Sequence, residues 1–291
     1  MSDLESSSKS AAAPDRVRIY GNDHSPWVQA VLLALHDQRI EHTIELAPPL
    51  SLFLESGILM PAARIDAAPW LLDSERILCG LGYSPVSEDD RSGLQRIFGG
   101  GARRRADHVP TFFQRFGRVR AGEGSLPRRL WQQFWRSFSM FYFFVILNVL
   151  ARRLERPGPD RIAADFQRFQ DRLTPDTEFI AGTSPDTVDL QFFGIVQMCA
   201  SIPGPSFEVL RTDPKLDRLR RWVSAMQTRF ADYDHLYTAD AFEPRQPEIR
   251  PSPASERVAY WFGLTTMFLA FPVTLPLVVY FASRIRRKGL L

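Results

Sequence analysis

The sequence is poor in cysteine and has no apolar run at its N-terminus. Its 291 residues contain only Cys79 and Cys199, which lie far apart and form no CxxC motif. This scarcity argues against a disulfide scaffold, a zinc site and a dithiol redox centre. The opening residues, MSDLESSSKSAAAPDR, lack the hydrophobic stretch of a signal peptide. We therefore predict a disordered N-terminus over residues 1–15 and a folded part that faces the cytoplasm.

Lysine is also rare, and neither sign of charge dominates. Of the 36 basic residues only Lys9, Lys215 and Lys288 are lysines, and 33 acidic residues leave a net charge of +3. This balance gives little reason to expect a nucleic-acid partner. Apolar residues make up 45% and charged residues 24% of the chain, which excludes general disorder. The bias toward arginine is typical of a GC-rich genome and indicates a bacterial source.

The first part of the chain has alternating strand and helix patterns. VRIYG reads as a short buried strand, Ser25 and Pro26 as the N-cap and first position of a helix, and EHTIEL as a second strand. A right-handed crossover with parallel pairing is the default for such a unit. A short helix, two further strands and another helix follow. We predict one compact α/β domain over residues 16–83 with the order βαβ, then ββα after the short helix.

Helical patterns recur from residue 84 to residue 239, without a convincing strand. We predict an all-helical domain there, followed by a stiff polar tether over 240–256 that carries prolines at 244, 247, 251 and 253. Within the helical domain, the pair Asp186 and Asp189 has the spacing of an N-cap and its reciprocal acidic residue. We assign this pair to folding.

A long apolar segment precedes the basic tail over residues 284–291. The 25 residues from Val258 to Ala282 include no Asp, Glu, Lys or Arg. A helix of this length is long enough to cross a bilayer core of about 30 Å. Tyr260 and Tyr280 lie near its ends, as interfacial aromatic residues do. We predict a membrane anchor over 257–283, a transmembrane or membrane-inserted helix. Prolines at 272 and 276 lie in the middle of the segment and make a helical hairpin the alternative to a kinked single span. We favour the kinked span, because each half of a hairpin would have only about 12 residues and its bend would leave backbone groups unpaired in lipid.

A second apolar segment, Phe138–Leu150, has only 13 residues and is too short to cross a bilayer. Its position between arginine pairs leaves two interpretations. It is either a buried helix of the helical domain or a helix whose aromatic face rests on lipid. We favour the buried helix.

Three segments carry the strongest family signal: HSPWVQAVLLAL, ILMPAARIDAAPWLLDSERIL and FIAGTSPDTVDLQFF. In this order and at these spacings they resemble the glutathione transferase family over roughly residues 17–230. The resemblance implies an α/β thioredoxin-like domain followed by an all-α helical domain. It also implies glutathione as co-substrate, an apolar small-molecule substrate and a homodimer.

The resemblance assigns a catalytic role to Ser25. In the family, a Ser, Cys or Tyr near the end of the first strand donates a hydrogen bond to the glutathione sulfur, and Ser25 matches the Ser or Cys version. The N-terminus of the following helix favours an anion in the same place. The alternative is that Ser25 only caps the helix. His24 is expected to be a solvated turn residue.

The glutathione-binding residues implied by the resemblance are Met60, Pro61, Asp73 and Ser74. Met60-Pro61 matches the residue before a cis-proline, whose backbone pairs with the tripeptide. Asp73 and Ser74 match the acidic–Ser pair that holds the γ-glutamyl end, and a pure helix cap is the alternative reading. One part of the family pattern is missing, because no residue of SLFLESGILM clearly supplies the ligand for the glycyl carboxylate.

These patterns lead to two functional hypotheses. The first is a membrane-anchored glutathione transferase-like protein that uses the glutathione thiolate on an apolar electrophile at the bacterial inner membrane, with lipid as a further partner. The second is a non-catalytic, metaxin-like binding or scaffolding module, which the missing glycyl-carboxylate ligand favours. Fold alone does not separate them.

Overall fold

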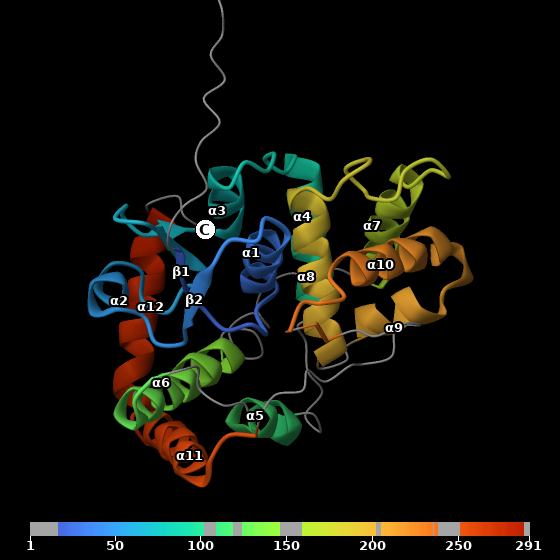
Figure 1. Cartoon of the computed structure of the whole chain (residues 1–291). Helices are drawn as coiled ribbons and strands as arrows, with labels where there is room; N and C mark the ends of the chain where they lie inside the picture. Colours follow the sequence, from blue (N-terminus) through green and yellow to red (C-terminus); the bar gives the residue numbers. More distant parts are fainter. Residues whose placement is uncertain are drawn as a thin grey trace, which may run out of the picture.

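The computed structural model describes residues 17–101, 109–118, 124–145, 159–201, 205–234, 236–237 and 251–287 (Figure 1). The predicted disordered N-terminus, the segment 240–250 of the predicted tether and the end of the basic tail lie outside these residues.

A four-stranded mixed sheet forms the first part of the molecule. Its strands and helices are β1 (Val17–Tyr20), α1 (Pro26–Asp37), β2 (His42–Glu45), α2 (Leu50–Ser56), β3 (Ala62–Ile65), β4 (Leu71–Leu72) and α3 (Ser74–Gly80). The strand order is β2-β1-β3-β4, with β1 parallel to β2 and antiparallel to β3. This is a thioredoxin-like arrangement, and both the element order and the parallel β1–β2 pair confirm the prediction.

The rest of the chain is helical. The helices are α4 (Glu88–Gly101), α5 (Val109–Arg118), α6 (Leu126–Val145), α7 (Pro159–Arg172), α8 (Thr187–Ser201), α9 (Pro205–Thr212), the 3-10 helix η4 (Pro214–Leu216), α10 (Asp217–Arg229), α11 (Ala254–Leu269) and α12 (Phe271–Arg287). Among the described residues after β4, no strand forms: Phe179 and Gly182 make an isolated bridge, and Pro251 is a single bridge residue. An all-helical second part is therefore confirmed.

Helix α1 lies at the centre of the molecule, between the sheet and α8 (Figure 1). Helix α1 carries apolar side chains on nearly all of its sides, and its residues from Val28 to Leu35 are buried. The two helices approach closely at Gly194, where an added Cβ would lie 2.2 Å from the carbonyl oxygen of Pro26. This contact fixes the N-terminal end of α1 against the helical domain.

The predicted single membrane span is not supported. No single helix among the described residues is long and apolar enough to cross a membrane, although α11 and α12 pass the test as a pair bent by 86°. The break falls at Ala270, directly before Phe271 and Pro272. Pro272 lies in the first turn of α12 and has no N–H with which to continue the hydrogen bonds of α11, which explains why α11 ends here. Pro276 lies inside α12. The break is thus a corner before Pro272 and not a kink within one helix.

Helices α11 and α12 pack on the protein. Tyr260 and Met267 of α11 and Val278 of α12 are buried, and the hydroxyls of Tyr142 and Thr274 hydrogen-bond between α6 and α12. The described part of the second apolar segment, up to Val145, belongs to α6. Its buried residues support the buried-helix interpretation, and residues 146–150 lie outside the described residues.

Candidate functional site

Ser25 occupies the N-cap position of α1, as the sequence predicts. Its backbone is extended, with φ −73° and ψ 127°, and its carbonyl accepts the first helical hydrogen bond from the N–H of Gln29 at 2.9 Å. The side chain makes no capping hydrogen bond. The hydroxyl therefore stands at the positive end of a 12-residue helix without serving as its cap. The residue is 7% exposed.

Met60 lies beside the turn that leads to Ser25. The Met60-Pro61 peptide bond is cis, in agreement with the expectation from the resemblance. The backbone N–H of Asn22 donates to the Met60 sulfur at 3.4 Å, and the carbonyl of Asn22 accepts from the N–H of Ser25 at 2.9 Å. One residue of the turn thus connects the two predicted positions.

Asp73 caps α3. Its Oδ1 accepts hydrogen bonds from the N–H groups of Glu75 at 2.9 Å and Arg76 at 3.1 Å. Both bonds use the same oxygen, so Oδ2 makes no hydrogen bond within the described part of the chain. The residue has a left-handed backbone, with φ 80°, and its side chain is exposed. The capping interpretation accounts for one carboxylate oxygen and leaves the other available.

Ser74 is buried and is already hydrogen-bonded within the protein. The side-chain amide of Gln191, on α8, donates to its hydroxyl at 3.2 Å. The hydroxyl keeps its own proton for a further acceptor, since here it serves as the acceptor. Asp73 and Ser74 thus lie at the start of α3, where the helical domain reaches the sheet.

A buried polar cluster next to Ser25 was missed by sequence reasoning. The Tyr237 hydroxyl donates to Oδ2 of Asp23 at 3.1 Å and lies 2.8 Å from Nδ1 of His24. The ring of Phe116 lies 4.4 Å from the His24 ring, centre to centre. His24, expected to be solvated, is 9% exposed, so that prediction is wrong. The cluster joins residues 213 positions apart, and no local pattern signals it.

The electrostatics of the cluster are set by burial. Desolvation, followed by the charge of Asp23, raises the pKa of Tyr237 well above its ordinary value, so the hydroxyl keeps its proton. Arg136 of α6 is 3% exposed, and desolvation lowers its pKa while Asp23 opposes that shift. The Arg136 guanidinium donates to the carbonyl of Phe116 at 3.4 Å. A buried cationic side chain and the N-terminus of α1 therefore share one region of the protein.

Within the described part of the chain, no side chain is placed as a ligand for the glycyl carboxylate. Arg64 lies on β3, in register with Arg18 of β1, and its Nε is buried without a hydrogen-bond partner among the described residues. The loop arginines at 103–105 lie outside the described residues.

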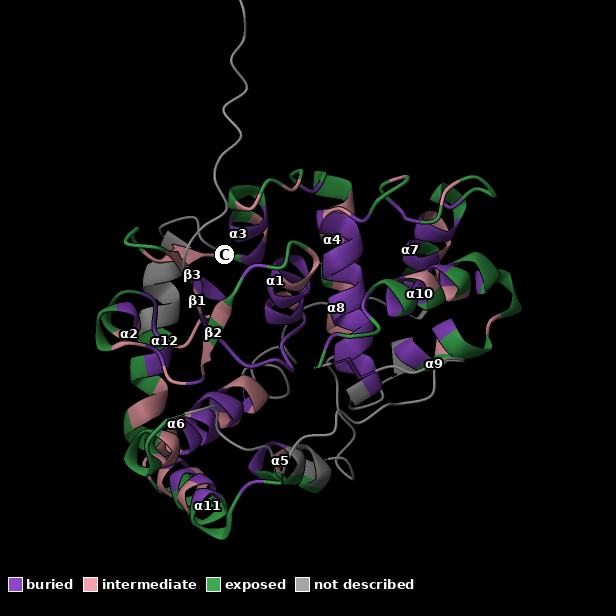
Figure 2. Cartoon of the chain, viewed as in Figure 1, coloured by how far each residue is buried: buried purple, intermediate pink, exposed green. Residues whose placement is uncertain are grey.

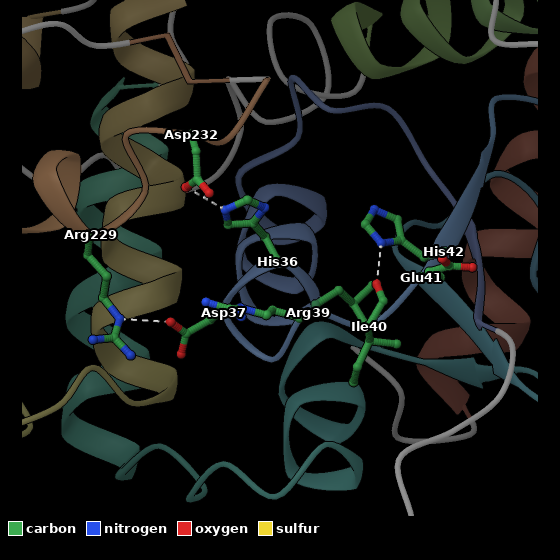
Figure 3. A pocket seen from close by; sticks show the side chains of 9 residues that line it. His36, Asp37, Arg39, Ile40, Glu41, His42, Arg229 and Asp232 are labelled. Atoms are coloured by element: carbon green, nitrogen blue, oxygen red, sulfur yellow. Dashed lines mark hydrogen bonds and ion pairs between the residues drawn. The ribbon is translucent and has the colours of Figure 1, made fainter.

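A polar cavity of about 810 Å³ lies at the opposite end of α1 (Figure 3). It is lined by His36, Asp37, Arg39, His42, Arg229 and Asp232 with their neighbours. The charged groups at its wall are largely paired: His36 Nε2 lies 3.0 Å from Asp232, and Arg229 Nε donates to Asp37 at 2.8 Å. At about 1.5 Å per residue, α1 separates this cavity from Ser25 by about 18 Å. It contains none of the predicted site residues.

Comparisons with known proteins find similarity to solved structures only at low identity. No protein-family model and no curated protein matches the sequence. The chain is similar to the solved structure of a possible glutathione S-transferase from Rhodopseudomonas palustris, with 15% identity, 73% of this chain and 94% of that chain covered, and a TM-score of 0.40. It is similar to glutathione transferase Omega 1C from Trametes versicolor, with 13% identity, coverages of 75% and 91%, and a TM-score of 0.43.

A third similar structure is a delta-class glutathione transferase from Nilaparvata lugens, with 14% identity, coverages of 86% and 99%, and a TM-score of 0.43. The thioredoxin-like arrangement is shown by the strand order and pairing of this chain itself.

Proposed function

We propose that the chain is a glutathione transferase-like protein that binds glutathione with the sulfur at the N-terminus of α1. The observation that carries this proposal is the Ser25 hydroxyl, which stands at the N-cap position and makes no capping hydrogen bond. A hydroxyl in this place can donate to a thiolate. The unpaired N–H groups of the first helical turn add positive potential at the same point.

The proposed chemistry is activation of the thiol. A hydrogen bond from Ser25 and the positive end of α1 both stabilise the thiolate more than the thiol, so the pKa of the bound thiol falls. The thiol proton leaves to solvent. The sulfur lone pair then attacks an electrophilic carbon of an apolar substrate, a carbon–sulfur bond forms, and the displaced group departs with its electron pair.

The remaining residues are proposed to hold the rest of the tripeptide. The backbone of Met60, fixed by Pro61, would pair with the central peptide unit in strand-like fashion. The free oxygen of Asp73 would accept from the ligand's α-ammonium, and the Ser74 hydroxyl would donate to its α-carboxylate. Met60 and Pro61 lie directly before β3, and Asp73 and Ser74 lie at the start of α3.

The test is glutathione binding by the wild-type protein and by Ser25→Ala. In the wild type, ultraviolet absorbance of the thiolate should show that the bound thiol has a lower pKa than free glutathione. Loss of a hydrogen bond to a charged sulfur costs about 1.5 to 3 kcal/mol, so Ser25→Ala should raise that pKa by about one unit or more. Ser224→Ala, at an exposed serine of α10, is the matched control and should change nothing.

A metaxin-like, non-catalytic module is the second candidate, and burial of the site favours it. Ser25 is only 7% exposed, and the Ser74 hydroxyl already accepts from Gln191. In that case calorimetry at millimolar glutathione would detect no binding, and the thiol-conjugation activity of wild type and Ser25→Ala would be equally absent. That result would overturn the transferase proposal.

Homodimer formation and a bacterial inner-membrane location stay predictions. Light scattering of the purified chain tests the first, and fractionation of expressing cells tests the second.

A further inference from the structure

Every large apolar side chain that is strongly exposed in the described part of the chain lies on one of four helices, α2, α6, α11 or α12. Figure 2 shows exposed segments on each of these helices. The exposed apolar residues include Leu54, Trp131, Phe262, Leu269, Val273 and Tyr280, which are 54% exposed or more. We call this set of surfaces the apolar face. Scattered single apolar residues need no explanation, but a concentration of this kind marks an interaction surface.

Aromatic contacts join the four helices that carry the apolar face. Across α2 and α6, the rings of Phe53 and Trp135 lie 5.2 Å apart. Across α6 and α11, Phe134 and Phe262 lie 6.4 Å apart, and Phe141 and Phe271 join α6 to α12 at 5.8 Å. Helix α6 is therefore the centre of a surface that extends from the thioredoxin-like domain to the C-terminal helices.

Helix α11 is apolar on both of its sides. The side against α6 buries Tyr260, Gly263 and Met267, and the opposite side exposes Phe262 and Leu269. A helix that packs on a protein with one face and meets water with the other would carry polar residues on the outer face. The outer side of α11 thus has the composition of a surface that is covered by something apolar.

The charges around the apolar face are mostly positive. The four helices together contain two acidic and seven basic residues. Glu256 is fully buried and lies 3.1 Å from Arg129, so this pair adds no net charge, and Arg136 is itself buried. Without these three residues, five basic residues and one acidic residue remain on the four helices. Arg257 is exposed before the charge-free segment, and Arg284, Arg286 and Arg287 follow it in sequence. An apolar surface with a basic border complements a lipid layer with anionic headgroups.

We infer that the apolar face binds one leaflet of an anionic phospholipid bilayer, with α11 and α12 lying in the plane of the interface. Two helices that meet at 86° define a plane, so both can rest on the same leaflet. A spanning orientation would require α11 to leave α6, which would expose the Glu256–Arg129 ion pair and the buried Tyr260. In the orientation that we propose, Leu54 and Trp131 of the folded domains also touch lipid.

Flotation of the full-length chain with vesicles of phosphatidylcholine and phosphatidylglycerol tests this inference. The wild type should float with these vesicles, and less with phosphatidylcholine alone or at high salt, where the basic border is screened. Removal of two exposed apolar side chains in Phe262→Ser/Leu269→Ser should weaken partition by about tenfold or more. The exposed positions make it expected that the variant keeps its fold, which circular dichroism checks.

Two further variants make the test specific. Leu54→Ser changes a residue of α2, outside the C-terminal helices, and should also weaken partition measurably. Arg221→Ser, on the far helix α10, removes an exposed charge without touching the apolar face and should leave partition unchanged. An unchanged partition in Leu54→Ser, together with loss in the α11 variant, would overturn the proposed orientation.

The topology is tested by labelling in sealed vesicles. The variant Cys79→Ser/Leu291→Cys has one accessible cysteine, at its C-terminus, because Cys199 is buried and should not react. A membrane-impermeant maleimide added outside the vesicles should label this C-terminal cysteine. Wild-type Cys79, which is exposed, is the positive control. Protection of the C-terminal cysteine would show a span and overturn the inference. So would failure to float combined with self-association that Phe262→Ser/Leu269→Ser abolishes, because a second copy would then cover the apolar face.

Discussion

At the scale of single residues, Asp189 shows how one carboxylate holds separate segments together. It is fully buried and accepts hydrogen bonds from the backbone N–H of Ile180 at 2.7 Å and of Ala181 at 3.0 Å. The indole N–H of Trp222, on α10, donates to it at 2.8 Å. Burial raises the pKa of Asp189, and these donors oppose the shift. The side chain therefore connects α8, α10 and the turn before α8.

We expect Asp189→Asn to destabilise the protein by about 2 kcal/mol or more. The amide keeps the size of the side chain but turns one acceptor into a donor, which then faces the N–H groups that the carboxylate received. Urea denaturation followed by tryptophan fluorescence measures the change in unfolding free energy. Asp176→Asn, at an exposed position of the same region, is the matched control and should stay within about 0.5 kcal/mol. Equal stability of both variants would contradict the role of Asp189.

The polar residues of this protein differ in how far the sequence alone could predict their contacts. The Ser25–Pro26 start of α1 and the Asp186–Asp189 cap are local signals, since spacing along one helix determines the geometry. The contact of Tyr237 with Asp23 depends instead on how two domains fold together. Burial of a polar cluster of this kind has no sequence pattern of its own, and only the three-dimensional structure reveals it.

At the scale of elements, α11 depends on a close approach to α6. An added Cβ on Gly263 would lie 2.2 Å from Oγ of Ser137 and 3.1 Å from the carbonyl oxygen of Phe134. Only glycine allows the two helices to come this near. The sequence shows that this segment is long and apolar, but it does not show the contact with α6. A helix that spans a membrane and a helix with one face packed on the protein can both have a run of residues without charge. The kinked single span that the sequence analysis favours is not supported, because α11 and α12 are separate helices bent by 86°.

Gly263→Ala should therefore push α11 away from α6 and lower the melting temperature. Overpacking of a tight contact costs about 1 to 3 kcal/mol. The atom nearest to the added Cβ is Oγ of Ser137, which Ser137→Ala removes. The double variant Gly263→Ala/Ser137→Ala should therefore recover part of the lost stability, and Ser137→Ala alone should have a small effect. Thermal denaturation of the three variants forms a double-mutant cycle. Strict additivity of the two changes would show that the residues do not touch.

At the scale of the whole molecule, the chain is a thioredoxin-like sheet, a helical domain around α8 and a C-terminal helix pair that packs on α6 (Figure 1). Periodicity was sufficient for the first two, because strands and amphipathic or buried helices have distinct repeats. The third was predicted as a separate anchor behind a tether. The structure places Tyr260 in one apolar cluster with Phe116 and Met140, and Met267 in another with Phe138 and Tyr142. The C-terminal helices therefore form two small apolar clusters with α5 and α6, separate from the main hydrophobic core.

Truncation after Pro253 distinguishes a structural C-terminal pair from a detachable anchor. Removal of α11 and α12 would uncover Phe138 and Tyr142 and delete the buried Tyr260 and Met267. At about 1.5 to 3 kcal/mol for each large side chain that returns to water, the truncated chain should lose about 5 kcal/mol or more of its unfolding free energy. Chemical denaturation and light scattering should then show a lower midpoint and aggregation. The full-length Phe262→Ser/Leu269→Ser variant changes only exposed positions of α11 and should keep the wild-type midpoint. A truncated chain that stays monomeric with an unchanged midpoint would mean that the core is complete without these helices, and the surface that we assign to lipid would then belong to an independent anchor.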